Sequence, residues 1–407
     1  MKKLLCGLLC AAILSTTASA AIVDFQIDEA TYQILDGETV TEKTLESAPF
    51  VNDQWRTMVP IRSISEAFGA EIGWEGSRQE VAIRQNGTEI LLYINSTSAL
   101  VNGAEITLDS APVIIEGRTF VPLRFVSEVL SYNVNYTPVS RHVVIDNTAP
   151  VLVCGTAFLS FAEAETLHWM FMEANRSVAA DMGMSENDLS MVCMDMVIDT
   201  ATKAIQLKNA FSSASLTPEM CTQILYAAET EGMPVPLVGL RDVLYEKLYH
   251  ASGYLALAHL EETVDLSSFY KEEFVCAKHI LVEDLETANK VYADAIAGQD
   301  FDSLIEKYNT DPGMETNPGG YVFTRNQMVP SFEEATYGAE IDSITKPVES
   351  IYGYHIIKRM PLPPFTGTQK QTVLTHLLSS QMETSAKPEQ LIDMSTLYSM
   401  VGVSEAE

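Results

Sequence analysis

The chain has 407 residues, of which 47% are hydrophobic and 20% are charged. This length predicts about two to four domains, and the apolar content lets each bury a core, which excludes disorder as the main state. With 25 Lys and Arg against 55 Asp and Glu, the net charge of −30 repels phosphate backbones and anionic lipid headgroups, so we expect no nucleic-acid partner. After the first 20 residues, no apolar run reaches the roughly 20 residues of a membrane-spanning helix, so the mature chain is predicted to have no membrane span.

Residues 1–20 have the features of a secretory signal peptide. A basic start at Lys2 precedes an apolar run from Leu4 to Leu14 and a small-residue cleavage site that ends at Ala20. We predict cleavage after Ala20 and an extracytoplasmic location, either secreted or associated with the cell envelope. Lipidation at Cys10 is the disfavoured alternative, because leucine precedes this cysteine where lipoprotein signals carry a small residue.

Four cysteines remain after cleavage, and no C-x-x-C or metal-like spacing occurs among them. They permit three disulfide pairings in an exported protein, and four buried thiols fit the sequence at least as well. These cysteines are Cys154, Cys193, Cys221 and Cys276.

A duplicated motif organises the first third of the chain. The pattern R-T-h-V-P-h-R, where h is hydrophobic, occurs at 56–62 and again 62 residues later at 118–124. Alternating apolar residues and Gly-containing turns around both copies predict β-hairpins, and a short helix is expected after each motif. We predict a tandem β-rich α+β module over residues 22–148.

This repeat resembles the copper amine oxidase N-terminal-like domain. The resemblance does not extend to copper chemistry, because oxidase catalysis needs an N-Y-[D/E] site and clustered histidines. Here Asn135 and Tyr136 are followed by Thr137, and His142 is the one histidine of the segment. The module is therefore expected to be a scaffold, with ligand binding, such as to a cell-wall or envelope component, as the alternative.

From residue 150 the apolar residues recur at helical spacing, which predicts an all-α lobe over 150–275. Thr217 and Pro218 form a helix start, as N-cap and first helical residue. The lobe is rich in methionine, which favours either an ordinary core or an adaptable apolar surface for unfolded chains. The methionines concerned are Met170, Met172, Met182, Met184, Met191, Met194 and Met196.

Residues 276–362 form a mixed unit with the order strand, helix, helix, loop, helix, strand. The first strand contains Ala277-Lys278-His279-Ile280-Leu281-Val282, and the last contains Tyr352-Gly353-Tyr354-His355-Ile356-Ile357-Lys358. Between them lie two amphipathic helices, the turn at Asp311 and the segment Gln327–Glu334. This unit resembles the parvulins, the PpiC-type peptidyl-prolyl cis-trans isomerases, and we expect the parvulin α+β fold.

The resemblance implies a substrate pocket for proline. An X-Pro bond has a cis/trans barrier of about 18–20 kcal/mol, and a catalyst lowers it by gripping the proline ring and stabilising the twisted amide. By resemblance, Met328 and Phe332 line the proline pocket, four residues apart as on one helix face, with Gln327 beside them.

The same resemblance assigns the catalytic residues. His279 and His355 correspond to the paired family histidines, which orient each other on adjacent strands, and Asp311 occupies a position where some parvulins carry Cys and others Asp. A negative charge there weakens the conjugation of the substrate amide. No metal or organic cofactor is implied. The loop Gly319–Phe323 is shorter than in many parvulins, and the acidic stretch Glu283–Glu286 excludes selectivity for phosphorylated substrates.

A helical lobe before a parvulin domain and a helical tail after it resemble the exported foldases of the PrsA and SurA type. In that family the tail completes the lobe, so residues 365–400 are expected to do so, with Gln371–Met382 packing on 155–265 through Leu374, Leu377 and Leu378. The resemblance implies an isomerase and chaperone for unfolded exported polypeptides that contain X-Pro bonds. The alternative is a non-catalytic envelope or surface-binding protein whose parvulin domain is vestigial.

Overall fold

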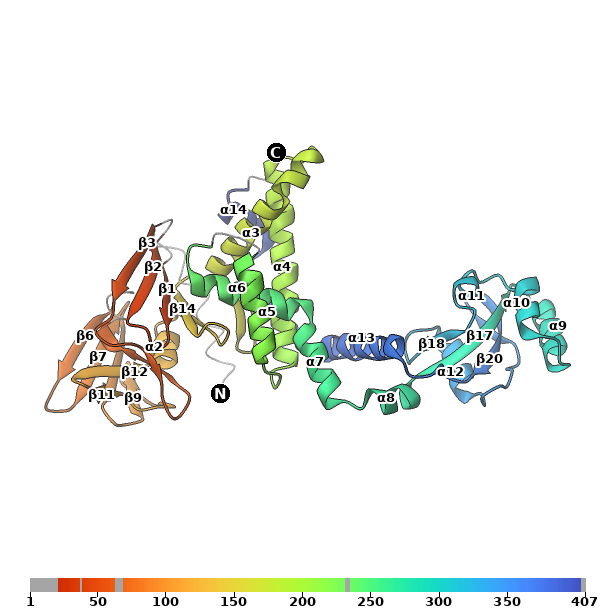
Figure 1. Cartoon of the computed structure of the whole chain (residues 1–407), viewed down its shortest axis with the longest axis horizontal. Coiled ribbons are helices and arrows are strands. Elements are labelled where there is room, and N and C mark those ends of the chain that lie inside the picture. Colours follow the sequence, from red (N-terminus) through yellow and green to blue (C-terminus); the bar gives the residue numbers. More distant parts are fainter. Residues whose placement is uncertain (1–20, 37–38, 63–68, 231–234, 404–407) are drawn as a thin grey trace. The chain divides into compact units, whose positions relative to one another are not determined.

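The computed structural model describes residues 21–36, 39–62, 69–230 and 235–403. The predicted signal peptide and its cleavage site lie outside these residues, as does most of the helix expected after the first copy of the repeat. The chain divides into two compact units, residues 1–256 with 384–407, and residues 257–383. The multidomain α+β architecture predicted from the sequence is confirmed (Figure 1).

The N-terminal module of the first unit consists of three antiparallel sheets. The first has the order β13 (Asn133–Thr137), β14 (His142–Asp146), β1 (Ala21–Gln26), β2 (Thr31–Asp36) and β3 (Thr39–Thr44). The second has the order β10 (Ala104–Thr107), β9 (Ser98–Val101), β8 (Thr88–Tyr93), β7 (Glu80–Gln85) and β6 (Glu71–Glu75). The third has the order β11 (Val113–Ile115), β12 (Arg118–Pro122), β5 (Thr57–Pro60) and β4 (Phe50–Val51).

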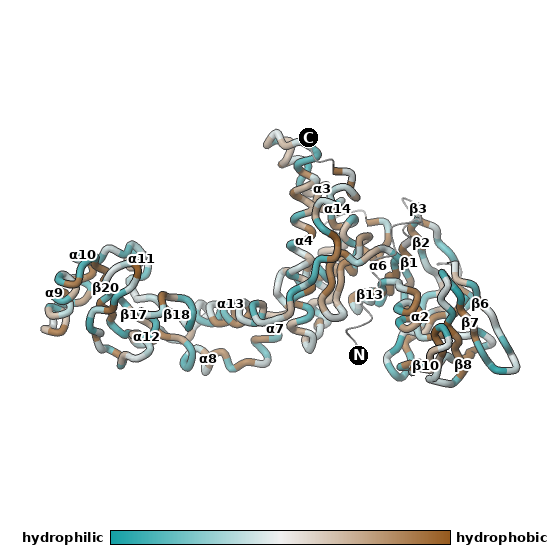
Figure 2. Tube along the Cα trace, turned by 180° about the vertical axis from the view of Figure 1, so that it is seen from behind, coloured by the Kyte–Doolittle hydropathy of each residue, from teal (hydrophilic) through white to brown (hydrophobic). Residues whose placement is uncertain are grey.

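The two copies of the repeat pair with each other in the third sheet. Strands β5 and β12, which carry the same motif, run antiparallel with Val59 opposite Val121 and Phe120 opposite Pro60. Both valines are fully buried in one core that also contains Phe25 and Ile83. In Figure 2 hydrophobic residues follow the strands of this module. Helix α2 (Leu123–Val129) follows the second motif, as predicted.

The second half of the first unit is a helical lobe. Its helices are α3 (Phe161–Asp181), α4 (Glu186–Ala210), α5 (Pro218–Thr230) and α6 (Val238–Ser252). Ser160 and Glu163 form a capping box at the start of α3, and Ser185 caps α4. The lobe also contains a small sheet that the helical prediction missed, because β15 (Pro150–Cys154) and β16 (Ala157–Ser160) form a hairpin around Gly155.

The C-terminal tail is divided between the two units. Strand β21 (Glu389–Gln390) pairs with β15, and α14 (Met394–Met400) buries Leu397 in the core of the lobe. Helix α13 (Gly367–Thr384) belongs almost entirely to the second unit, where Lys370 bonds Glu261 of α7 (Tyr254–Thr263) at 2.7 Å. The expectation that residues 371–382 pack against residues 155–265 is thus met at α7, which lies within that range but belongs mostly to the second unit.

Apolar contacts fix α13 in that position. Leu374 is buried, whereas Leu377 and Leu378 are half-buried. The ring of His376 packs against Phe269 and Phe274, at the end of α8 (Leu266–Glu273).

The rest of the second unit is one antiparallel sheet with helices on both faces. The sheet has the order β18 (Tyr321–Phe323), β17 (Val275–Val282), β20 (Gly353–Met360) and β19 (Val348–Ser350). Helices α9 (Leu285–Ile296) and α10 (Phe301–Tyr308) pack with Ile280 and Ile356 on one face. On the other face α12 (Pro330–Gly338) packs with Ala277 and Ile357, and the short α11 (Gly313–Thr316) precedes β18.

The four cysteines of the described chain are unpaired thiols. Burial raises the pKa of each of them, which favours the protonated form. None of the helices in the described ranges is both long and apolar enough to cross a bilayer.

Candidate functional site

The sheet of the second unit brings His279 and His355 together. In the register of β17 and β20, Leu281 lies opposite His355 and His279 lies opposite Ile357. All four side chains therefore project from the same face, because residues two apart in a strand share a face. The two imidazole rings are stacked at 5.2 Å between centroids, and their Nδ1 atoms are 3.0 Å apart. Both histidines are buried.

A chain of hydrogen bonds runs through this pair. His279 Nε2 lies 2.7 Å from Asp311 Oδ2, and His355 Nε2 lies 2.7 Å from Ser350 Oγ. Because an ionised carboxylate only accepts, we assign the proton of His279 to Nε2, which leaves its Nδ1 as an acceptor. His355 then donates from Nδ1 to His279 and accepts the Ser350 hydroxyl proton at Nε2. One arrangement of protons thus satisfies both neutral rings.

Asp311 is the acceptor at the end of that chain. Its Oδ2 also accepts from the Tyr321 hydroxyl at 2.7 Å, and its Oδ1 accepts from the backbone N–H of Gly313 at 3.0 Å. Burial acts to raise the pKa of Asp311, but the hydrogen bonds from Tyr321, Gly313 and His279 outweigh it and hold the pKa below its usual value. The carboxylate is therefore ionised at neutral pH, with 22% of its side chain exposed.

Both imidazoles are held neutral by their surroundings. Burial lowers the pKa of His279, although Asp311 opposes the shift. Burial and the neighbouring His279 together lower the pKa of His355 to about 4. Two imidazolium ions at this separation would repel each other in a poorly solvated site.

An apolar wall lies beside the histidines. The Phe332 ring meets His279 and His355 edge-on, at 5.2 Å and 5.4 Å between centroids. Phe332 is buried in a cluster with Phe323, and Met328 packs on that cluster. The structure thus places Phe332, His279, His355 and Asp311 in one contiguous group, with Met328 at its apolar side.

Met328 and Phe332 do not lie on one helix, contrary to the expectation from their spacing. Helix α12 begins at Pro330, which takes the first helical position, and Val329 is its N-cap. Proline favours this position because it lacks the N–H that a helix start leaves unpaired. Met328 therefore belongs to the preceding loop, and the two side chains meet through the cluster.

The loop before α12 is held by Glu333. Its Oε1 accepts from the backbone N–H groups of Gln327 and Met328, at 2.8 Å and 2.9 Å. The Gln327 side chain bonds the backbone N–H of Thr324 at 2.9 Å and is exposed. Gln327 thus stabilises the loop that presents Met328, and no contact joins its side chain to the histidine pair.

Sequence reasoning missed two residues that touch the group. Tyr321 lies in the shortened loop, and its hydroxyl reaches Asp311 because β18 pairs with β17 in a register that sets Tyr321 opposite Ala277. Ser350 precedes the last strand by a tight turn and reaches back to His355. Only Ser350 could have been found from the sequence. It lies five residues before His355, so a hairpin that ends in the strand of His355 would bring its hydroxyl close to the imidazole.

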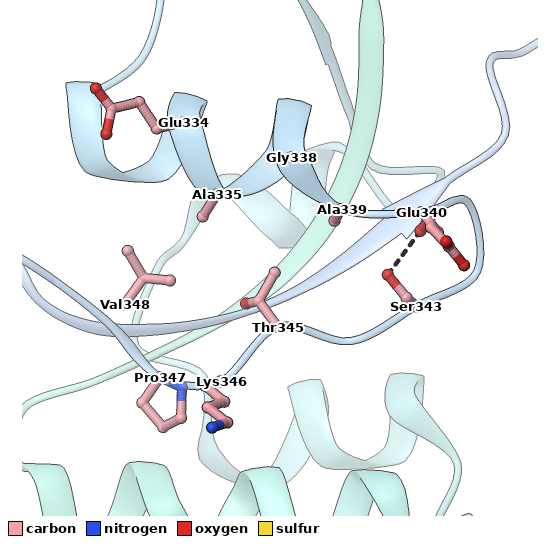
Figure 3. A pocket seen from close by; sticks show the side chains of 10 residues that line it. All are labelled: Glu334, Ala335, Gly338, Ala339, Glu340, Ser343, Thr345, Lys346, Pro347 and Val348. Carbon is pink, nitrogen blue, oxygen red and sulfur yellow. Dashed lines mark hydrogen bonds between the residues drawn. The ribbon is translucent and has the colours of Figure 1, made fainter.

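A separate shallow groove lies between α12 and the segment that leads into β19 (Figure 3). It is lined by Glu334, Ala335, Gly338, Ala339, Glu340, Ser343, Thr345, Lys346, Pro347 and Val348. None of the predicted site residues lines this groove, so it is distinct from the group around Asp311.

Residues 282–361 match the model of the PPIC-type PPIASE domain. The match confirms the parvulin prediction for this part of the chain. Residues 34–145 match the model of the copper amine oxidase N-terminal domain, which confirms the resemblance stated for the tandem module.

Individual relatives agree with the domain match. The foldase protein PrsA of Halalkalibacterium halodurans is 52% identical over 82 residues, which are 20% of this chain and 25% of that protein. The foldase protein PrsA of Caldanaerobacter subterraneus is 37% identical over 125 residues, 29% of this chain and 40% of that protein. This chain thus covers less than half the length of either relative.

One solved structure adds a comparison over a longer segment. The crystal structure of the peptidylprolyl isomerase PrsA from Bacillus cereus is 21% identical, covers 63% of this chain and 90% of that chain, and has a TM-score of 0.28.

Proposed function

We propose that this chain is a peptidyl-prolyl cis-trans isomerase that acts as a foldase on exported polypeptides. The observation that carries the proposal is the joined group of Asp311, His279 and His355, with Phe332 packed against both imidazoles. The match of residues 282–361 to the PPIC-type PPIASE domain supports the same activity.

The proposed chemistry breaks no covalent bond. Met328 and Phe332 provide apolar surface for the proline ring, which gains contact only when it leaves water. Asp311 supplies a fixed negative charge beside the amide. At the transition state the amide loses its conjugation, so its nitrogen regains a lone pair, its C–N bond gains single-bond character and its carbonyl oxygen becomes less negative. A preorganised charge that favours this state over the planar amide lowers the barrier.

In this mechanism the histidines act as positioning residues. The proton arrangement gives each ring a donor and an acceptor partner and leaves none of their nitrogens for proton transfer to a substrate. Their function would be to hold Asp311 in place and to support the Phe332 ring from the buried side.

The helical lobe supplies the proposed chaperone surface. Met182 and Met196 are 73% and 40% exposed, and Trp169 is 37% exposed, whereas Met170 and Met194 are buried in the core. The methionine-rich segment is thus partly core and partly exposed, and the exposed side chains can adapt to unfolded exported chains. An extracytoplasmic location after signal-peptide cleavage belongs to the same proposal.

The test is a proline-isomerisation assay on a tetrapeptide substrate. We expect Asp311→Ala and Met328→Ala to lower kcat/KM by at least tenfold. Asp294→Ala is the matched control, because Asp294 pairs with Lys290 on α9, which covers the opposite face of the sheet. Equal rates in the parent and all three variants would exclude catalysis at this site and favour a non-catalytic envelope protein.

A further inference from the structure

A pocket in the N-terminal module has no part in the proposed isomerase activity. Its volume is about 810 Å³, and it is lined by residues from both copies of the repeat. Glu46, Arg62 and Trp74 come from the first copy, and Ile114 and Arg118 come from the second.

Two arginines share one carboxylate at this pocket. Glu46 Oε1 accepts from Arg62 Nη1 at 2.7 Å, and Glu46 Oε2 forms an ion pair with Arg118 Nε at 2.6 Å. Both oxygens of the carboxylate are therefore engaged, whereas each guanidinium has five N–H donors. The three side chains are between 44% and 68% exposed. Arg118 thus keeps N–H groups besides Nε that can donate to a ligand.

An aromatic platform lies beside these donors. Trp74, on β6, is 52% exposed, although large aromatic side chains usually bury most of their area. Ile114 is 42% exposed at the same pocket. A flat indole face with adjacent apolar surface suits the C–H face of a sugar ring, while a guanidinium fork suits a carboxylate or phosphate.

The repeat provides an internal comparison. Arg56 and Arg118 begin the two copies of the motif, and each bonds an acidic residue of the other copy: Arg118 bonds Glu46, and Arg56 bonds Asp109. The crossed ion pair is thus common to both copies and is structural. Arg56 and Asp109 do not line the pocket around Trp74. Their ion pair is therefore a control that has the same kind of contact but lies outside the proposed binding site.

We propose that this pocket binds an anionic glycan. A sugar ring stacks on Trp74, and a carboxylate or phosphate of the same glycan accepts hydrogen bonds from Arg118. Long-range repulsion from the acidic chain is screened beyond about 8 Å at physiological ionic strength, so it does not prevent these short contacts. The inference is independent of the isomerase site, which lies in the other unit.

The experiment is isothermal titration of the full mature chain with four defined probes. Oligogalacturonate tests a carboxylated glycan, a phosphomannan oligosaccharide tests a phosphorylated one, chitotetraose tests a neutral one, and polyglutamate tests an anion without sugar rings. We expect one or both anionic glycans to bind at least tenfold more tightly than chitotetraose and polyglutamate.

The variants separate stacking from charge. Trp74→Ala and Arg118→Gln should each weaken binding of the anionic glycan at least tenfold, while Trp74→Phe retains most of it. Arg56→Gln breaks the equivalent ion pair outside the pocket and should leave the affinity within twofold. The proposal is overturned if neither anionic glycan binds, if polyglutamate binds equally well, or if Arg56→Gln weakens binding as much as Arg118→Gln does.

Discussion

Mild acid should destabilise the second unit, residues 257–383, through the histidine pair. The pKa of His355 is lowered from its usual 6.5 to about 4, so the folded state binds fewer protons than the unfolded state between these values. The contribution of His355 to folding stability is therefore fully present above about pH 6.5 and is lost as the pH falls toward 4. At 1.36 kcal/mol per pKa unit, the full loss is about 3 kcal/mol, of which about 2 kcal/mol falls between pH 7 and pH 5. The lowered pKa of His279 adds in the same direction.

Hydrogen exchange resolved to peptides measures this effect in the intact chain. Protection factors in β17 and β20 should fall roughly 25-fold from pH 7 to pH 5, after correction for the intrinsic exchange rate. Asp311 does not confuse the result, because its lowered pKa contributes stability that is lost only at more acidic pH. A His355→Gln variant should be less stable at pH 7 but show a flatter pH dependence. Constant protection factors over this range in the parent would refute the reasoning.

Four further substitutions test individual contacts and backbone positions by urea unfolding. Ser350→Ala removes the partner of His355 Nε2 and should cost about 1–3 kcal/mol and reduce the isomerisation rate. In Gly313→Ala, the new Cβ would lie 1.8 Å from the Tyr321 hydroxyl, so Tyr321 should leave Asp311 at a cost of about 2 kcal/mol. Trp55 has a φ of 57° and is 84% exposed at the position that Gly117 occupies in the second copy. Trp55→Gly should therefore leave stability unchanged or raise it by up to about 1 kcal/mol, whereas Gly117→Ala should lower it by about 1 kcal/mol; a clear loss with Trp55→Gly would contradict this account.

The parvulin unit was the most predictable part of the chain because its two central strands, β17 and β20, are largely apolar runs with a histidine in each. A run such as 277–282 predicts a buried strand, and the resemblance supplied the pairing of His279 with His355. The hydrogen-bond partners of the site residues depend instead on the register between strands that are far apart in the sequence. Tyr321 reaches Asp311 only because β18 aligns Ala277 with Tyr321, and no local pattern in the sequence fixes that alignment.

For the C-terminal tail, too, the sequence predicts the element but not the surface on which it packs. The apolar stripe of α13 predicts a packed helix, but periodicity does not identify the surface that it packs against. Aromatic contacts of His376 place the helix beside α8. Two residues of β21, which carry no strand signal of their own, instead join the sheet of the lobe through Leu152 and Val153. Short pairings of this kind gain their stability from the neighbouring strand and not from propensity.

The direction of the hydrogen-bond chain supports the proposed mechanism, which has no proton transfer. Every donor in it points toward Asp311: the Ser350 hydroxyl to His355, His355 to His279, and His279 to the carboxylate. A general base would need a free lone pair facing the substrate, whereas here the buried imidazole lone pairs are occupied. Reversing any one bond would leave a buried ring nitrogen without a partner, at a cost of about 1–3 kcal/mol. The network therefore keeps the charge of Asp311 fixed in place, as the proposed stabilisation of a twisted amide requires, whereas a proton relay would move that charge.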